Sequence, residues 1–181
     1  MAGSARTALT CMPPEEADLQ RPRALQTFWD YWLEVQQGWA RAGSPGPAPP
    51  RSLLNLARMR AFLDSLMLAD VIRDDAAAAP ADSDYRFRVY GTALANLLGA
   101  DHTGAMLSTV PAPAGDMLAA IFAAVLEGRK PTAFRFEMPE PSYARIACGL
   151  ACPMTRQGER IDEVLALILP EEFRWDPPPY L

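Results

Sequence analysis

The sequence predicts an α+β fold, with a five-stranded antiparallel sheet that carries helices on one face and an aromatic N-terminal helix on the other. Between residues 68 and 170, strand-like and helix-like segments follow one another in the order β-β-α-α-β-β-β. The last segment, residues 164–169, is apolar on both faces, which is typical of a central strand covered on each side. If the two central helices cover one face of the sheet, the second face remains for the N-terminal helix.

Residues 24–41 are expected to form this N-terminal helix, because apolar side chains recur there at spacings of three and four. Two roles are open for the aromatic stripe. It covers the sheet of its own chain, which we favour, or it contacts a second subunit. We expect the helix to pack on the outer sheet face and to contribute to a homodimer; the interface candidates are Phe28, Trp29, Trp32, Val35 and Trp39.

Proline-rich stretches divide the rest of the chain. Residues 1–23 lack periodicity and contain three prolines, which indicates a disordered N-terminus. Residues 42–50 combine four prolines with two glycines, a composition that favours a linker. We therefore expect a folded domain over residues 51–170, followed by a Pro-rich tail over 171–181 that is anchored at most by Phe173 and Trp175.

The first half of this domain is expected to hold a capped helix and two strands. Ser52 or Asn55 is placed to cap a helix that ends at Asp64, followed by a strand over 67–75 and a turn over 76–84. Thr92 is expected to cap a short helix over 93–98. Between them, the alternation predicts a strand with Tyr85, Phe87 and Val89 on one face and Arg86, Arg88 and Tyr90 on the other.

The second half is expected to hold a longer helix and three strands. Asp116 is placed to cap the helix, whose apolar stripe consists of Met117, Leu118, Ile121, Phe122, Val125 and Leu126. The strands follow over residues 131–138, 143–154 and 161–169, and the last two are joined by a polar hairpin around Gly158. In the middle strand, Ala147, Gly149 and Ala151 share one face, and their small size leaves room beside the sheet.

Composition and charge exclude several classes of protein. The chain has 17 Lys and Arg residues against 22 Asp and Glu, and its arginines are scattered singly, so we expect no nucleic-acid partner. Cys11, Cys148 and Cys152 include no C-x-x-C pair, and with a single histidine this argues against a zinc site or a disulfide framework. Because no apolar run suits a signal peptide or a membrane span, we expect a cytoplasmic protein.

Three motifs then point to a family: LADVIRD at 68–74, YRFRVYGTALANLLGADHTG at 85–104 and EGRKPTAFRFE at 127–137. The segment 51–170 that contains them resembles the compact stand-alone PAS proteins of bacteria, known mainly from alphaproteobacteria. The resemblance implies the fold described above and a sensory role. It does not name a ligand, because PAS domains bind many ligands on one scaffold.

We expect no cofactor and no enzymatic activity. A flavin-binding photosensor of this family carries a helix with the sequence Asn-Cys-Arg-Phe-Leu-Gln, whereas residues 92–99 contain no cysteine. A haem-binding PAS domain needs an axial ligand, and the only candidate, His102, is favoured as a solvated turn residue. His102 also lacks a carboxylate placed to form a catalytic pair.

We predict a sensory or regulatory module without its own output domain, which acts in bacterial signalling through small-molecule binding or protein–protein interaction. The alternative is a small α+β enzyme, of the isomerase or dehydratase type, that uses the same cavity. The candidate pocket lies between the sheet and the long helix, with Arg88, Tyr90 or Arg145 for an anionic group and Met106, Met117, Ile121, Phe134, Phe136 and Cys148 for an apolar one. Ordinary core packing is the favoured interpretation of the apolar residues, and a surface or ion-paired position that of Arg88.

Overall fold

The computed structural model describes residues 8–19, 22–43, 46–73, 82–138, 144–157 and 159–173. In this part of the chain, six strands form one antiparallel sheet in the order β1-β4-β5-β6-β2-β3. The strands are β1 (Leu9–Met12), β2 (Leu66–Ile72), β3 (Asp84–Tyr90), β4 (Thr132–Glu137), β5 (Ile146–Met154) and β6 (Glu163–Pro170). The predicted α+β class is confirmed, and the sheet has one strand more than the predicted five.

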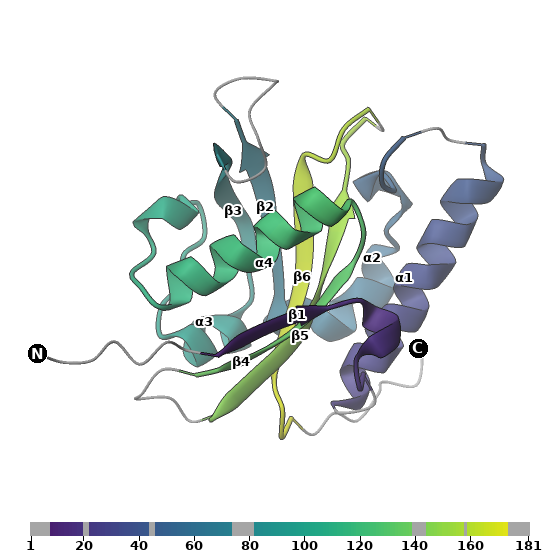
Figure 1. The fold of residues 1–181 in the computed structure, drawn as a ribbon. Helices are drawn as coiled ribbons and strands as arrows, with labels where there is room; N and C mark the ends of the chain where they lie inside the picture. The colour runs from purple at the N-terminus through teal and green to yellow at the C-terminus, as the bar shows by residue number, and fades with distance from the viewer. Residues whose placement is uncertain are drawn as a thin grey trace, which may run out of the picture.

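Helices cover both faces of this sheet (Figure 1). The α-helices in the described residues are α1 (Arg23–Arg41), α2 (Leu56–Met59), α3 (Thr92–Leu98) and α4 (Ala114–Gly128). Short 3-10 helices join them: η1 (Pro14–Glu16), η2 (Arg51–Leu53), η3 (Arg60–Ser65) and η5 (Leu107–Thr109). The core on one face is closed by α3 and α4, and the core on the other face by α1, α2 and η3.

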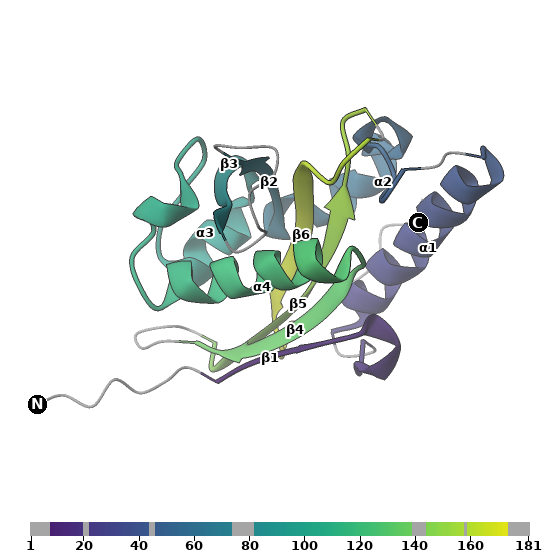
Figure 2. The same cartoon turned by 45° about the horizontal axis from the view of Figure 1, so that its top comes forward.

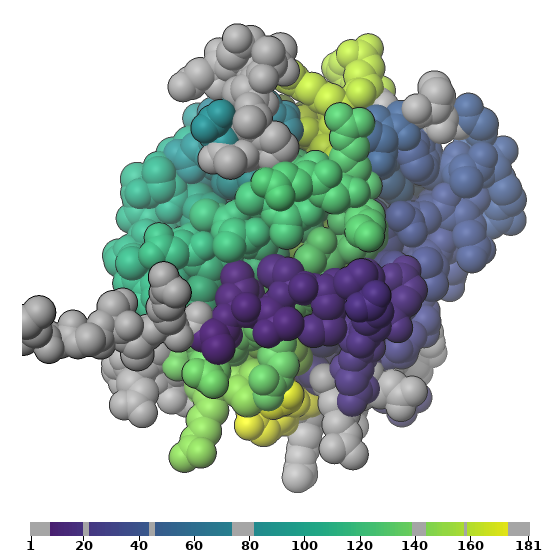
Figure 3. All heavy atoms as spheres, viewed as in Figure 1, coloured from purple at the N-terminus to yellow at the C-terminus, as the bar shows by residue number. Residues whose placement is uncertain are grey.

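The N-terminal segment is the clearest departure from the prediction, because residues 9–12 form a strand where disorder was expected. Leu9 lies opposite Phe136 of β4, and Met12 lies opposite Ala133. Figure 2 shows β1 along the outer side of β4, and Figure 3 shows the same segment at the surface beside α4. Nothing in the local pattern marks this strand, since its pairing partner comes more than half the chain later.

The aromatic stripe of α1 covers the sheet of its own chain. Phe28 and Trp32 are fully buried, and the Phe28 ring meets Phe62 of η3 edge-on, with 5.5 Å between ring centroids. Trp29 and Val35 are also buried in this core. Four of the five interface candidates are therefore used within the chain, and Trp39 alone of the five stays partly exposed.

β6 is the central strand that the apolar pattern predicted. It pairs with β5 on one side and β2 on the other, and its residues are buried from Glu163 to Leu169. Because both faces of β6 meet a helix layer, its side chains contribute alternately to the two cores.

β3 contains a β-bulge that the sequence pattern does not reveal. Its register with β2 shifts between Leu68, which opposes Val89, and Ala69, which opposes Phe87, so Arg88 is the extra residue. Beyond the bulge the alternation changes phase: Val89 is 38% exposed, whereas Tyr90 is 7% exposed. The predicted orientations of Val89 and Tyr90 are therefore wrong.

The helix starts follow the prediction at one site and differ at two. Asn55 caps α2, as its side-chain oxygen accepts hydrogen bonds from the backbone N–H groups of residues 57 and 58. However, α3 begins at Thr92 behind Gly91, and α4 begins two residues before Asp116, so neither predicted cap is correct. Gly91 is needed because a Cβ there would overlap the backbone oxygen of Asp64.

Some predicted features lie outside the described residues. They are Gly158, Trp175 and most of the turn predicted over residues 76–84.

Candidate functional site

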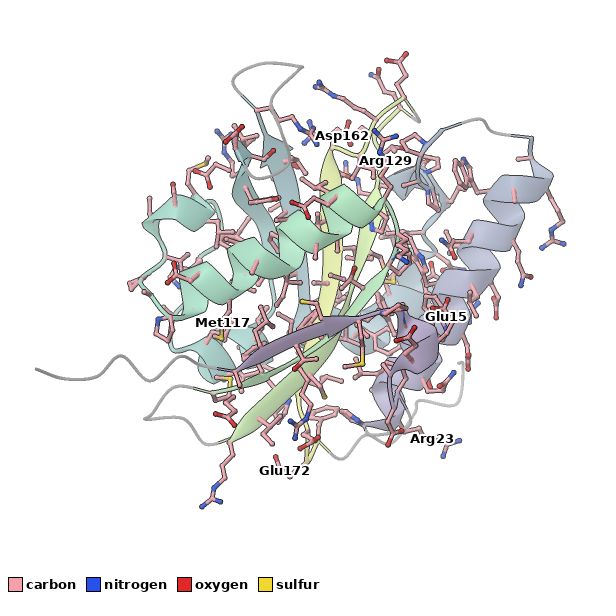
Figure 4. All side chains as sticks on the ribbon, in the orientation of Figure 1. Glu15, Arg23, Met117, Arg129, Asp162 and Glu172 are labelled. Atoms are coloured by element: carbon pink, nitrogen blue, oxygen red, sulfur yellow. The ribbon has the colours of Figure 1, made fainter. Side chains whose placement is uncertain are left out.

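Four of the predicted pocket residues belong to the packed core beneath α4. Met117 (labelled in Figure 4), Ile121, Phe134 and Phe136 are each at most 5% exposed. The Phe134 ring lies over Gly149, so close that a Cβ on that residue would overlap it. The room that the small residues of β5 leave is therefore filled by Phe134, and the favoured interpretation of these residues as core is the correct one.

Three further candidates do not join them. Cys148 lies in the opposite core, under α1, because neighbouring residues of β5 point to opposite faces. Burial raises the pKa of its thiol to about 12. Arg145 is exposed just before β5, and Arg88 forms an ion pair with Asp70, at 3.5 Å between Arg88 Nε and Asp70 Oδ2. The predicted pocket residues thus do not all lie together. The prediction is clearly wrong for Cys148, which belongs to the core on the other face of the sheet.

Tyr90 is buried beside His102, near the end of β3. The two rings meet edge-on at 5.5 Å between centroids, and the His102 ring lies 6.2 Å from that of Phe87. The Tyr90 hydroxyl has no hydrogen-bond partner among the described residues, and burial raises its pKa. His102 begins a turn, as expected, because its carbonyl accepts a hydrogen bond of 2.9 Å from the Ala105 backbone N–H, but its ring is half-buried against aromatic rings rather than fully solvated. Met106, the last candidate, forms an isolated bridge with Arg86 at the edge of β3.

A cavity of about 310 Å³ lies at a different place, where the start of β3 meets η5 and the first turns of α4. Its volume is at the lower end of the range for small-molecule sites. Among the described residues, the lining combines three carboxylates, two serines and a tyrosine with apolar side chains and contains no basic residue. These residues are Asp82, Ser83, Asp84, Tyr85, Leu107, Ser108, Val110, Gly115, Asp116 and Ala119. None of the predicted pocket residues belongs to it.

Asp84 holds the wall of this cavity together. Its Oδ1 accepts hydrogen bonds from the backbone N–H groups of Tyr85, at 2.7 Å, and Ser108, at 3.1 Å. Its Oδ2 accepts a hydrogen bond of 2.6 Å from the Ser108 hydroxyl. This carboxylate therefore fastens η5 to the first residue of β3. Sequence reasoning missed it, because its partner lies 24 residues away and no motif marks the pair.

Two other residues shape the cavity from the sides of β3 and α4. Tyr85 is 2% exposed, its ring contacts Phe122 of α4 at 4.9 Å, and its hydroxyl has no hydrogen-bond partner among the described residues. Burial raises the pKa of Tyr85 to about 12, so the phenol stays neutral near neutral pH. At Gly115, a Cβ would overlap the backbone oxygen of Val110, which explains how α4 starts so close to the end of η5.

A cluster of charges lies on the other face of the sheet, at one end of β2 and β6. Asp70 and Glu163 are paired residues of these strands and are 5% and 0% exposed. Arg156 contacts both carboxylates, with 3.1 Å between its Nε and Glu163 Oε1. Asp162, labelled in Figure 4, accepts a hydrogen bond from the Arg156 backbone N–H. Together with the contact of Arg88 with Asp70, these ion pairs join β2, β3, the turn between β5 and β6, and β6. The expectation that Arg88 is ion-paired is confirmed.

Within the described ranges, no three or more His, Cys, Asp or Glu side chains are grouped to hold a metal ion. The helices that the structure describes include none long and apolar enough to cross a lipid bilayer. No known protein family, curated protein or solved structure matches this chain.

Proposed function

We propose that the chain is a sensory or regulatory module of the PAS type, which binds a small molecule in the cavity at the start of β3. The order of elements after η3 supports this proposal, because β2-β3-α3-α4-β4-β5-β6 is the β-β-α-α-β-β-β order of a PAS domain. These five strands belong to one antiparallel sheet, and both α3 and α4 pack on the same face. Such a module signals when a ligand shifts its population between two states.

The proposal that the protein binds a ligand rests on this cavity. Its lining places polar groups and apolar surface side by side, as small-molecule sites do. Three carboxylates, with no basic residue in the described part of the lining, favour a ligand that carries a positive charge, such as a small amine. The anionic ligand expected from Arg88 and Arg145 does not suit this cavity, because neither arginine lines it.

Thermal-shift screening of small amines and neutral polar metabolites tests the proposal, because a ligand of the folded state must raise the melting temperature. Ala119 and Ala120 are both exposed on α4, but Ala119 lines the cavity and Ala120 does not. We expect hits to stabilise the wild type and Ala120→Trp but not Ala119→Trp, in which the indole occupies the cavity. If no compound stabilises the wild type, or if Ala119→Trp responds equally, the cavity is not a ligand site.

A further inference from the structure

Exposed leucines gather in one segment of the α1-side layer. Among the described residues, Leu53, Leu56, Leu63 and Val89 are the large apolar side chains that are exposed, and the three leucines lie within residues 51–63. Leu56 is the most exposed of them, at 78%, and the significance of the three leucines lies in their number within one short segment. Leu56 and Leu63 are seven residues apart on the continuous helical stretch of α2 and η3, so they lie on the same side of it.

The inner side of this stretch is firmly held, so the exposure of Leu56 does not come from a loose segment. Met59 and Phe62 are at most 3% exposed in the core under α1. The backbone N–H of Asn55 donates a hydrogen bond of 2.7 Å to the hydroxyl of Tyr31. The guanidinium of Arg58 lies 4.5 Å from the centroid of the same tyrosine ring. The leucines are therefore presented outward by a fixed scaffold.

The same segment is locally basic in an acidic chain. Residues 51–64 contain three arginines and one acidic residue, Asp64, whereas the whole chain has a net charge of −5. Arg51 and Arg58 each contact one carboxylate, of Glu163 and Glu34. Arg60 is exposed and takes part in no ion pair with the residues that the structure describes. We call Arg51, Leu53, Leu56, Arg58, Arg60 and Leu63 the leucine–arginine patch.

We propose that the leucine–arginine patch docks the protein on the surface of an anionic lipid bilayer. The leucines enter the boundary of the acyl chains. The guanidinium of Arg60, which forms no ion pair with the described residues, binds the phosphates of the headgroups, and Arg51 and Arg58 add positive charge beside it. The acidic remainder of the chain orients the protein with this patch toward the negative surface. This inference is independent of the proposed function, because the patch lies on the other face of the sheet from the cavity.

Two other occupants suit the patch less well. The exposed apolar residues are aliphatic, whereas the anchors of protein interfaces are enriched in Trp and Tyr, with Leu and Val under-represented. A second copy of this chain would bring the same basic patch against itself, and like charges oppose such a contact. A bilayer needs neither an aromatic anchor nor a complementary pocket.

Co-sedimentation of the full chain with vesicles tests this inference. We expect binding to vesicles of phosphatidylcholine and phosphatidylglycerol in equal parts, little binding to phosphatidylcholine alone, and release by high salt. Leu56→Ser and Arg60→Glu should each lower the bound fraction several-fold. Lys130→Glu, the same charge change at an exposed residue after α4, should leave it nearly unchanged.

Each variant should keep the wild-type melting temperature, because the substituted side chains are exposed. The inference is overturned if the mixed vesicles bind no better than phosphatidylcholine alone, or if Lys130→Glu weakens binding as much as Arg60→Glu. It is also overturned if soluble poly-glutamate binds the patch while vesicles do not, which would assign this surface to an acidic polypeptide.

Discussion

Arg51 donates a hydrogen bond of 2.9 Å to the fully buried carboxylate of Glu163, which lies 112 residues further along the chain. The same carboxylate oxygen accepts a second hydrogen bond, of 3.1 Å, from Arg156. The backbone N–H of Arg51 also donates to the carbonyl of Thr155, at 2.9 Å. Residues that follow the Pro/Gly stretch are thus fastened to the β5–β6 hairpin by both main chain and side chain.

Removing this carboxylate should weaken the fold more than removing either exposed partner. We expect Glu163→Ala to lower the free energy of unfolding by about 2–3 kcal/mol, because it leaves two arginines without their shared acceptor. Arg51→Met should cost about 1 kcal/mol, since Arg51 is half exposed and Arg156 still contacts Glu163. Denaturant unfolding measures both. Glu34→Ala, which breaks the surface pair with Arg58, is the control; an equal loss there would contradict the role of Glu163.

The packing of Phe134 on Gly149 predicts that replacing Gly149 by alanine destabilises the fold. The same replacement at Gly38 should stabilise it. Gly149→Ala should lower the free energy of unfolding by about 2 kcal/mol or more, because the new methyl group overlaps both the Phe134 ring and the backbone of Leu167. Gly38→Ala, on the exposed side of α1, meets nothing within 4 Å and should raise it by about 0.5–1 kcal/mol. Thermal or urea unfolding of the two variants decides the matter, and a tolerated Gly149→Ala would show that β4 and β5 are not packed as described.

Tyr85→Phe should have a pH-dependent effect on stability. Near neutral pH it should be neutral or should stabilise by about 1 kcal/mol, because it removes a buried hydroxyl that has no partner among the described residues. The folded-state pKa of Tyr85 is raised from 10.0 to about 12. The contribution of the neutral phenol to the free energy of unfolding is therefore complete below pH 10 and is lost as the pH rises toward 12. The difference in unfolding free energy should therefore move in favour of phenylalanine over that window. A difference that stays constant with pH would refute this.

Two tryptophans of α1 should differ sharply in their cost of removal. Trp32→Ala should lower the free energy of unfolding by about 3–5 kcal/mol, because the side chain is fully buried between α1 and the sheet. Trp39→Ala should cost about 1 kcal/mol, because that side chain is partly exposed near the end of the helix. Native mass spectrometry of both variants also tests the expectation that the N-terminal helix contributes to a homodimer. A dimer lost only in Trp39→Ala would place the subunit contact at that end of α1.

The structure does not bring the predicted pocket residues together around a space, and the reason is physical. The periodicity of the sequence places four apolar residues in one core: Met117, Ile121, Phe134 and Phe136. It does not say whether space remains between their side chains. That depends on the Phe134 rotamer over Gly149, a packing detail that periodicity does not contain. The cavity instead depends on Asp84, whose hydrogen bonds to Ser108 join segments that have no common pattern.

Local periodicity was enough to predict α1, the stripe of α4 and the central place of β6, because spacings of three to four residues, or apolar runs, specify which faces are buried. The tertiary structure decided the pairing of β1 with β4, the bulge at Arg88 that turns Tyr90 inward, and the meeting of Arg51 with Glu163. Each of these depends on free energies of contact between residues far apart in the chain. Such contacts exist only once the sheet has formed, so no window of sequence contains them.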